Sequence, residues 1–191
     1  MQRFAVLASH EGTTLQAVMD ACSSGELEAE VVLVISNNSK SGALRRAHEA
    51  GIKGLHISGV THPEGESQAI LDALVSAEAD WVLTLGYMKK IGSEVLNHFE
   101  NRVINSHPSL LPKFGGAGYY GRKIQESVIA SGELESGATI HLVNQEYDRG
   151  AIIAQSKVLV ESFFTASLLH QTVQKSEKLL LVNTLKRLLT Q

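Results

Sequence analysis

The sequence predicts a single-domain α/β protein with a Rossmann-like, doubly wound and mostly parallel sheet and a long C-terminal helix. In the first hundred residues, apolar runs alternate with segments of helical spacing. The apolar runs are continuous, which is typical of parallel strands buried on both faces. With 191 residues and 43% hydrophobic content, the chain has the size and composition of one globular domain.

In the first half, we expect strands in four short segments that are mostly apolar. These expected strands cover residues 4–8, 31–35, 54–57 and 81–85. Apolar residues three and four apart predict the intervening helices, at residues 14–23, 42–50, 67–79 and 93–99. Gly51 suits the left-handed end of the second of these helices. Strand and helix thus alternate, as a parallel sheet requires.

The pattern changes after a short strand at residues 103–105. A long loop with two prolines is expected over residues 107–121, followed by a helix at 123–131. Two further strands, 138–143 and 152–160, flank a polar turn. A long amphipathic helix over 165–189 closes the chain, and we expect its Leu179–Val182 cluster to pack in the core. Loops as long as 107–121 are usually functional or disordered.

Charge and cysteine content restrict the possible partners. Seventeen basic and 20 acidic residues give a formal net charge of −3, which argues against broad nucleic-acid binding. Cys22 is the only cysteine, so no internal disulfide can form and a reducing cytoplasm fits. The first apolar run is too short for a signal peptide or a membrane span. We therefore expect a cytoplasmic protein that does not bind membranes.

The first strand leads into Ser-His-Glu-Gly-Thr-Thr at residues 9–14, directly before a helix. Free N–H groups at a helix N-terminus suit a phosphate, and Gly12, Thr13 and Thr14 are the candidate ligands. The alternative is that Thr13 or Thr14 simply caps the helix. The segment matches neither the dinucleotide-binding nor the P-loop pattern.

Asn105 and His107 lie two residues apart where a strand ends, so an extended backbone directs them to the same side. An amide N–H and an imidazole there can hydrogen-bond a carbonyl oxygen that gains negative charge. The alternative is a turn asparagine and a buried, fully hydrogen-bonded histidine.

His141 and Asp148 form a third feature, with Glu146 between them. A carboxylate beside an imidazole raises the histidine pKa and fixes its tautomer. Asp148 could equally be an ordinary turn residue. The sequence has no paired-cysteine or H-E-x-x-H spacing and no G-x-S-x-G elbow, so we expect neither a metal site nor a serine nucleophile.

Residues 105–113, Asn-Ser-His-Pro-Ser-Leu-Leu-Pro-Lys, closely resemble the N-x-H-P-S-L-L-P signature of formyltransferases that use 10-formyltetrahydrofolate. Residues 137–143 and 146–153 are similar to the rest of that active site, and the resemblance runs from residue 1 to about 180. The length matches the small purine-pathway members, which formylate phosphoribosylglycinamide. Members acting on methionyl-tRNA or on sugar nucleotides usually carry a further C-terminal domain.

The resemblance implies direct transfer of formyl to an amine, without a covalent enzyme intermediate. Asn105 and a protonated His107 stabilise the oxyanion in that scheme. Asp148 holds His107 and helps move a proton, and Thr139 and His141 support the centre. Residues 1–100 then form a phosphate-binding half and residues 101–160 a catalytic and folate-binding half.

The resemblance also implies two substrate pockets. The folate pocket is formed by Met88, Lys89, Lys90, Ile91, Glu146 and Tyr147. The substrate phosphate binds at Gly12, Thr13 and Thr14, and its ribose and amine at Gln174 and Glu177. The implied partners are folate and a phosphorylated ribosyl amine, with no metal, in a monomer or homodimer.

The sequence departs from the family pattern in three places. The usual phosphate loop, S-G-x-G-S-N, is replaced at residues 9–14, where Glu11 adds a negative charge. Residues 115–121 are long and glycine-rich enough for a substrate lid, and no arginine near 62–68 matches the family's folate contact. The alternatives are a formyltransferase for another amine such as an amino-sugar nucleotide, a 10-formyltetrahydrofolate hydrolase, or a non-catalytic folate- or nucleotide-binding protein.

Overall fold

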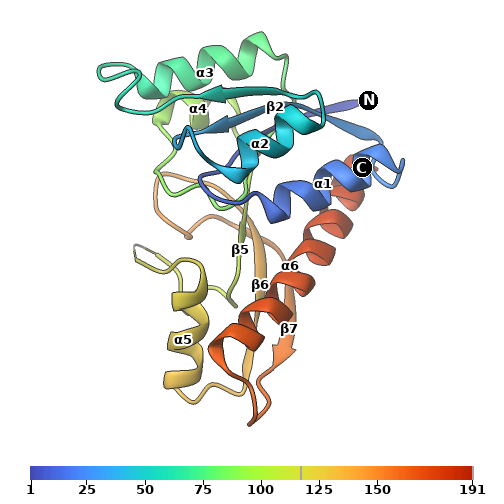
Figure 1. Cartoon of the computed structure of the whole chain (residues 1–191), viewed down its shortest axis with the longest axis vertical. Helices are drawn as coiled ribbons and strands as arrows, with labels where there is room; N and C mark the ends of the chain where they lie inside the picture. The colour runs from blue at the N-terminus through green and yellow to red at the C-terminus, as the bar shows by residue number, and fades with distance from the viewer. Residues whose placement is uncertain (117, 191) are drawn as a thin grey trace.

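A computed structural model describes residues 1–116 and 118–190 (Figure 1). The strands are β1 (Gln2–Leu7), β2 (Ala29–Ser36), β3 (Lys53–His56), β4 (Trp81–Thr84), β5 (Val103–His107), β6 (Glu135–Leu142) and β7 (Ile152–Leu159). The helices are α1 (Thr13–Ser23), α2 (Gly42–Glu49), α3 (Glu66–Ser76), α4 (Ser93–His98), α5 (Arg122–Ala130) and α6 (Ala166–Leu189). Every expected strand and helix is present, with ends shifted by a few residues.

The strands form one sheet in the order β3-β2-β1-β4-β5-β6-β7. Strands β1 to β5 run parallel, whereas β6 pairs antiparallel with β5 and β7 antiparallel with β6. The strand order reverses between β1 and β4, which is the position where open α/β sheets form a ligand crevice at their carboxyl edge. The predicted fold class is therefore confirmed, and the sheet itself marks where a ligand site belongs.

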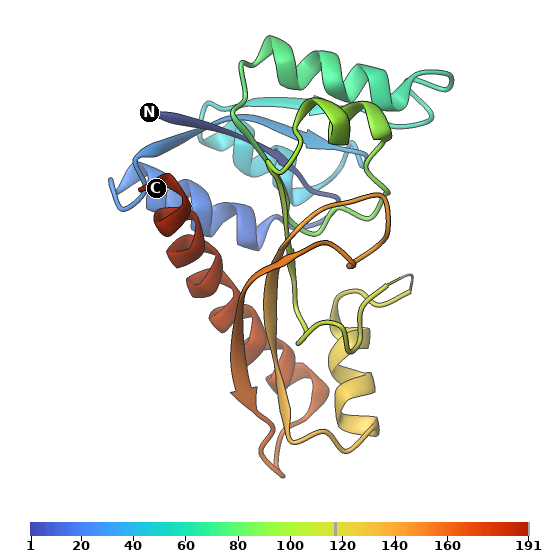
Figure 2. The ribbon, with the colours of Figure 1, turned by 180° about the vertical axis from the view of Figure 1, so that it is seen from behind.

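Helices cover both faces of the parallel half (Figures 1 and 2). Phe4 and Val6 of β1 pack in one core with apolar residues of α1, α2 and α6. Ala5 and Leu7 point the other way, into a core with α3 and α4. Because successive strand residues face opposite sides, this alternation explains why β1 is continuously apolar from Phe4 to Leu7. A smaller cluster joins α5 to the first turns of α6.

Two details differ from the sequence-based expectation. Strand β5 continues to His107, which pairs with Thr139 of β6, and β6 begins at Glu135, because its first residues pair with β7. The long loop therefore starts after His107; residue 117, within the expected lid, lies outside the described part of the chain. The second detail is Leu179, which is 68% exposed, while Leu181 is fully buried. Only part of the leucine cluster faces the core, since one turn of α6 cannot direct four successive residues inward.

Candidate active site

A cavity of about 650 Å³ opens at the carboxyl ends of β1, β4 and β5. It is lined by all of the predicted site residues except Thr139: Gly12, Thr13, Thr14, Met88, Lys89, Lys90, Ile91, Asn105, His107, His141, Glu146, Tyr147, Asp148, Gln174 and Glu177. These residues come from segments far apart in the chain, so the fold gathers them at the predicted edge.

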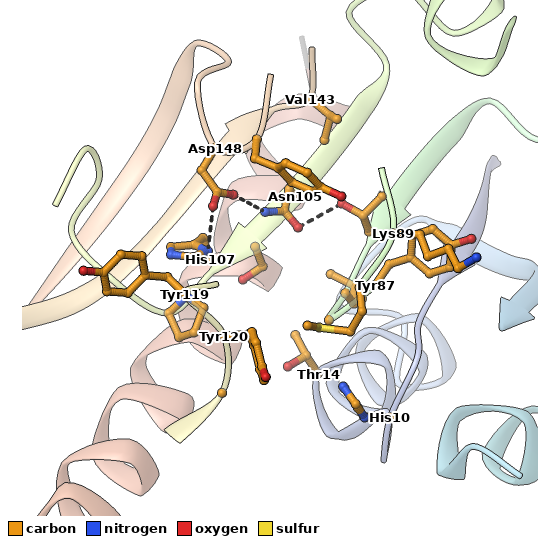
Figure 3. Close-up of a pocket in the computed structure, with 18 of the residues that line it drawn as sticks. His10, Thr14, Tyr87, Lys89, Asn105, His107, Tyr119, Tyr120, Val143 and Asp148 are labelled. Carbon is orange, nitrogen blue, oxygen red and sulfur yellow. Dashed lines mark hydrogen bonds and ion pairs between the residues drawn. The ribbon is translucent and has the colours of Figure 1, made fainter. Parts of the chain in front are cut away.

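Asn105 lies at the centre of this cavity (Figure 3). The strand register places Thr84 of β4 and His141 of β6 on either side of it. Its amide Nδ2 donates to Nε2 of His141 at 3.0 Å and, more weakly, to Oδ1 of Asp148 at 3.4 Å. Its Oδ1 accepts from the hydroxyl of Thr84 at 2.9 Å. The carboxamide is thus held at both ends.

The tautomer of His141 follows from its neighbours. Its Nδ1 lies 2.8 Å from the carbonyl oxygen of Leu142, which can only accept, so Nδ1 carries the proton. With the proton on Nδ1, Nε2 is left to accept from the Asn105 amide, 3.0 Å away. His141 therefore orients Asn105, in keeping with its predicted supporting role.

His107 is 5% exposed and makes two polar contacts. Its Nε2 donates to the carbonyl oxygen of Phe114 at 2.9 Å, and its Nδ1 lies 3.6 Å from Oδ2 of Asp148. Burial lowers the pKa of His107 below its ordinary value, although Asp148 and the Phe114 carbonyl act in the opposite direction. The lowered pKa favours the neutral ring in the free protein, whereas the expected imidazolium belongs to the step in which the oxyanion forms.

Asp148 lies beside both histidines: its Oδ2 is 3.6 Å from Nδ1 of His107, a contact drawn in Figure 3, and its Oδ1 is 3.5 Å from Nε2 of His141. Its backbone is left-handed, with φ of 54°, and its Oδ2 accepts from the N–H of Gly116 at 2.8 Å. Burial raises the pKa of Asp148, but contacts with His141, His107 and the Gly116 N–H outweigh burial and hold the pKa below its usual value. Asp148 is thus a carboxylate within a partly buried cluster.

The loop before α1 presents backbone N–H groups to the cavity. Gly12 is the N-cap, with φ of 69°, and no side chain caps the helix. The alternative that Thr13 or Thr14 serves only as a cap is therefore wrong. A Cβ atom on Gly12 would come within 2.8 Å of the Ala43 backbone, so close packing against α2 also requires glycine here. The carboxylate of Glu11 is 73% exposed and lies 3.6 Å from Arg45, which partly offsets its charge.

The loop after β4 forms the opposite wall. Its backbone is tied to the first loop, because the Met88 N–H donates to Oγ of Ser9 at 2.9 Å. Lys89 pairs with Glu66 at 3.2 Å and lies beside Tyr87, on the far side of the cavity from Tyr119 and Tyr120 (Figure 3). Aromatic side chains therefore line the cavity on two sides.

Helix α6 supplies Gln174 and Glu177. Glu177 is 6% exposed, and its Oε1 accepts from the Ser106 hydroxyl at 2.6 Å. Burial raises the pKa of this carboxyl, with the Ser106 hydrogen bond and Lys178 acting against burial. A buried carboxyl with one protein donor keeps acceptor capacity for a ligand hydroxyl or amine.

Thr139 is the one predicted site residue that the cavity does not include. Its hydroxyl donates to the Ser109 carbonyl at 2.7 Å and accepts from the Leu111 N–H at 3.1 Å. Thr139 thus fixes the loop after β5 and is not part of the cavity lining; it pairs with His107, two positions along β6 from His141.

Sequence reasoning gave no role to four groups of this site. They are the hydroxyls of Thr84 and Ser106, the carbonyl of Phe114 and the N–H of Gly116. The backbone groups carry no side-chain signal. The hydroxyls could have been noticed as polar residues in otherwise apolar strand ends.

Comparison with known proteins agrees with this geometry. The profile of a family described as formyl transferase matches residues 2–185. The chain belongs to the formyl transferase family. A chloroplastic phosphoribosylglycinamide formyltransferase from Vigna unguiculata is 39% identical over 98% of the chain, and a phosphoribosylglycinamide formyltransferase from Haemophilus influenzae is 39% identical over 83% of it. The chain spans 61% of the Vigna protein and 73% of the Haemophilus protein.

Solved formyl transferase structures share the whole fold. The phosphoribosylglycinamide formyltransferase from Bacillus halodurans superposes with a TM-score of 0.92 at 32% identity, covering 100% of this chain and 96% of that one. A formyltetrahydrofolate deformylase from Pseudomonas syringae gives a TM-score of 0.86 at 26% identity over 97% of this chain and 60% of that one.

Residues 1–116 and 118–190 contain no group of three or more His, Cys, Asp or Glu side chains placed to hold a metal ion. In the same residues, no helix combines the length and apolar character needed to cross a membrane.

Proposed function

We propose that this chain transfers the formyl group of 10-formyltetrahydrofolate to the amine of 5′-phosphoribosylglycinamide, as in purine biosynthesis. The main support for the proposal is that Asn105, His107 and Asp148 lie together in one cavity. This cavity is bounded by the N-terminus of α1 and by the loop after β4. Phosphoribosylglycinamide formyltransferases with 39% identity support the choice of amine.

The cavity has room for two ligands that meet at Asn105. The phosphate lies on the N–H groups of Gly12, Thr13 and Thr14, where the helix dipole favours an anion. Gln174 and Glu177 hold the ribose and amine. The folate lies against residues 88–91 and the Glu146–Tyr147 loop, which form the other wall.

In the reaction, the amine nitrogen attacks the formyl carbon and the carbonyl oxygen becomes an oxyanion. The Asn105 N–H that makes the weak 3.4 Å contact with Asp148 is the donor available to that oxygen. The amine must lose a proton. Nδ1 of His107, which lies beside Oδ2 of Asp148, accepts this proton directly or through one water.

A proton on Nδ1 converts His107 to a cation, which Asp148 stabilises beside the oxyanion. The bond between the formyl carbon and N10 of the folate then breaks, and N10 takes up the proton. The products are the formamide and tetrahydrofolate. Burial, which keeps His107 neutral at the start, makes it ready to accept this proton.

The test is an assay of formyl transfer from 10-formyltetrahydrofolate with three acceptors: 5′-phosphoribosylglycinamide, an amino-sugar nucleotide, and water alone. We expect a kcat/KM for phosphoribosylglycinamide at least 100-fold above that for the sugar. Equal or greater turnover of the sugar would contradict the proposed amine.

Hydrolysis is the second candidate, because the deformylase from Pseudomonas syringae shares this fold. Water needs the oxyanion donor but neither the phosphate loop nor Glu177. The loop and Glu177 therefore favour transfer to an amine. If 10-formyltetrahydrofolate is consumed equally fast with and without the amine, the result would favour hydrolysis.

We expect small-molecule partners, a cytoplasmic location, and a monomer or homodimer. Cell fractionation checks the location, and light scattering with size-exclusion chromatography checks the oligomeric state.

A further inference from the structure

Thr84 is a buried polar residue at the end of β4, 4% exposed. Parallel pairing places it directly beside Asn105, and Asn105 in turn lies opposite His141. The side chains of Thr84, Asn105 and His141 therefore form a hydrogen-bonded row across three strands. Neither the sequence motif nor the proposed reaction assigns a role to Thr84.

The direction of the hydrogen bonds in this row is determined by chemistry. One end of the Asn105 carboxamide faces Nε2 of His141 and a carboxylate oxygen of Asp148, both acceptors, so the amide nitrogen must lie there. The amide oxygen consequently faces Thr84, whose hydroxyl donates to it at 2.9 Å. The other acceptor in reach of that hydroxyl, the Ile104 carbonyl, is farther away at 3.4 Å.

Within the described residues, Thr84 is the single donor to this oxygen. Its hydroxyl fixes the rotation of the carboxamide about the Cβ–Cγ bond, which decides where the free N–H points. Donation to the oxygen also polarises the amide and strengthens its N–H as a donor, since linked hydrogen bonds reinforce one another.

We propose that Thr84 is a positioning residue for formyl transfer, which holds and polarises the Asn105 amide for the oxyanion. The inference rests on the proposed function of Asn105. Thr84 does not touch a substrate in this scheme; it acts on the rate through Asn105 alone.

The main test compares Thr84→Val with Thr84→Ser. Valine has nearly the shape of threonine but no hydroxyl, whereas serine keeps it. We expect kcat of Thr84→Val to fall roughly tenfold, because misplaced catalytic groups cost up to about 100-fold. KM for both substrates should stay within about twofold, and Thr84→Ser should keep most of the native rate. An unchanged kcat in Thr84→Val would overturn the proposal, as would an equal loss in Thr84→Ser.

A double-mutant cycle with Asn105→Ala tests whether Thr84 acts through Asn105. In the Asn105→Ala background, Thr84→Val should have no further effect on kcat. The same tenfold loss in that background would show that Thr84 acts by another route and would overturn the inference.

A measurement without turnover separates this inference from the proposed function. The side-chain amide of Asn105 gives a pair of proton–nitrogen NMR signals that can be assigned with Asn105→Ala. In Thr84→Val, we expect these signals to shift and to exchange with water faster than in the native protein and in Thr84→Ser. Unchanged signals would overturn the inference even if formyl transfer is observed. Altered signals without any formyl transfer would leave the positioning intact and contradict the proposed function. If Thr84→Val does not fold, Thr84→Ala serves the same measurements.

Discussion

Two parts of the cavity, the loop at residues 9–14 and the centre at Asn105, are built in different ways. The loop at residues 9–14 offers backbone N–H groups at the start of α1, and its Glu11 side chain lies beside Arg45. The centre at Asn105 consists of side chains, each with a specific partner within 3.6 Å. A site made of backbone groups tolerates changes in side chains, which explains how the unusual residues Glu11 and Thr14 can occur in it. A side-chain network has no such tolerance, so substitutions there should have much larger effects.

The largest effect is expected for Asp148→Asn. The left-handed backbone at this position suits asparagine, so the variant should fold. Loss of proton transfer typically costs about 100- to 10,000-fold, and we expect kcat to fall within that range. Because Asp148 raises the pKa of His107, the substitution should lower that pKa further; since the neutral ring accepts the proton, the acid limb of the pH–rate profile should move to lower pH.

The measurements are the pH–rate profile and the imidazole NMR titration of both proteins. Native turnover together with an unmoved His107 titration would show that Asp148 is an ordinary turn residue.

The second-largest effect on kcat is expected for Asn105→Ala. Removal of one oxyanion donor costs about 100- to 1,000-fold in kcat, and folate binding should change little because the folate pocket has other walls. Asn97→Ala, on the exposed surface of α4, is the matched control and should keep native activity. Steady-state kinetics and calorimetry on both variants check the prediction; near-native kcat in Asn105→Ala would remove Asn105 from the catalytic centre.

Thr13→Asp tests the loop at residues 9–14, where backbone N–H groups form the proposed phosphate site. An aspartate in the first turn of α1 interacts favourably with the helix dipole, so the variant should fold. Its negative charge should, however, repel the substrate phosphate. We expect the Kd for phosphoribosylglycinamide to rise roughly tenfold and the Kd for folate to stay constant. Thr13→Asn has nearly the same shape without the charge and should bind almost normally. If calorimetry shows equal weakening of both ligands, the phosphate site is misplaced.

The smallest effect is expected for Glu177→Gln, which should stabilise the protein while weakening amine binding. Burial raises the pKa of Glu177 in the folded state, so its contribution to stability is present at low pH and is lost as the pH rises through the folded pKa. At pH 8 we therefore expect a higher Tm than in the native protein, and at pH 4 almost no change.

Thermal unfolding at both pH values measures this difference. Glu161→Gln, at an exposed position, is the control and should change Tm at neither pH. An equal Tm change at pH 4 and pH 8 for Glu177→Gln would contradict a titration effect.

The order of strands and helices and the spacing of Asn105 and His107 could be predicted because they depend on local pattern. Continuous apolar runs require burial on both faces, and a spacing of two in a strand places side chains on one side. The pairing of Asn105 with His141 could not be predicted, because it depends on the register between strands 36 residues apart.

The burial of His107 could not be predicted for a related reason. The sequence shows a carboxylate that can raise the pKa, but not the burial that outweighs it. Likewise, the contact between His107 and the Phe114 carbonyl depends on the path of the loop after β5, which no side chain in that loop encodes.

Helix α6 has a consequence for how the protein is made. It follows every other helix and strand in the chain, yet Leu181 and Leu185 of α6 pack in the same core as Leu15 and Val18 of α1. At synthesis rates of about 5–20 residues per second, the ribosome adds α6 on the order of 10–30 s after α1. During that interval α1 has emerged without its covering helix, and its apolar side chains are open to chaperones or to other nascent chains. Slow codons placed between β7 and α6 should therefore lower the yield of folded protein more than slow codons placed after α6.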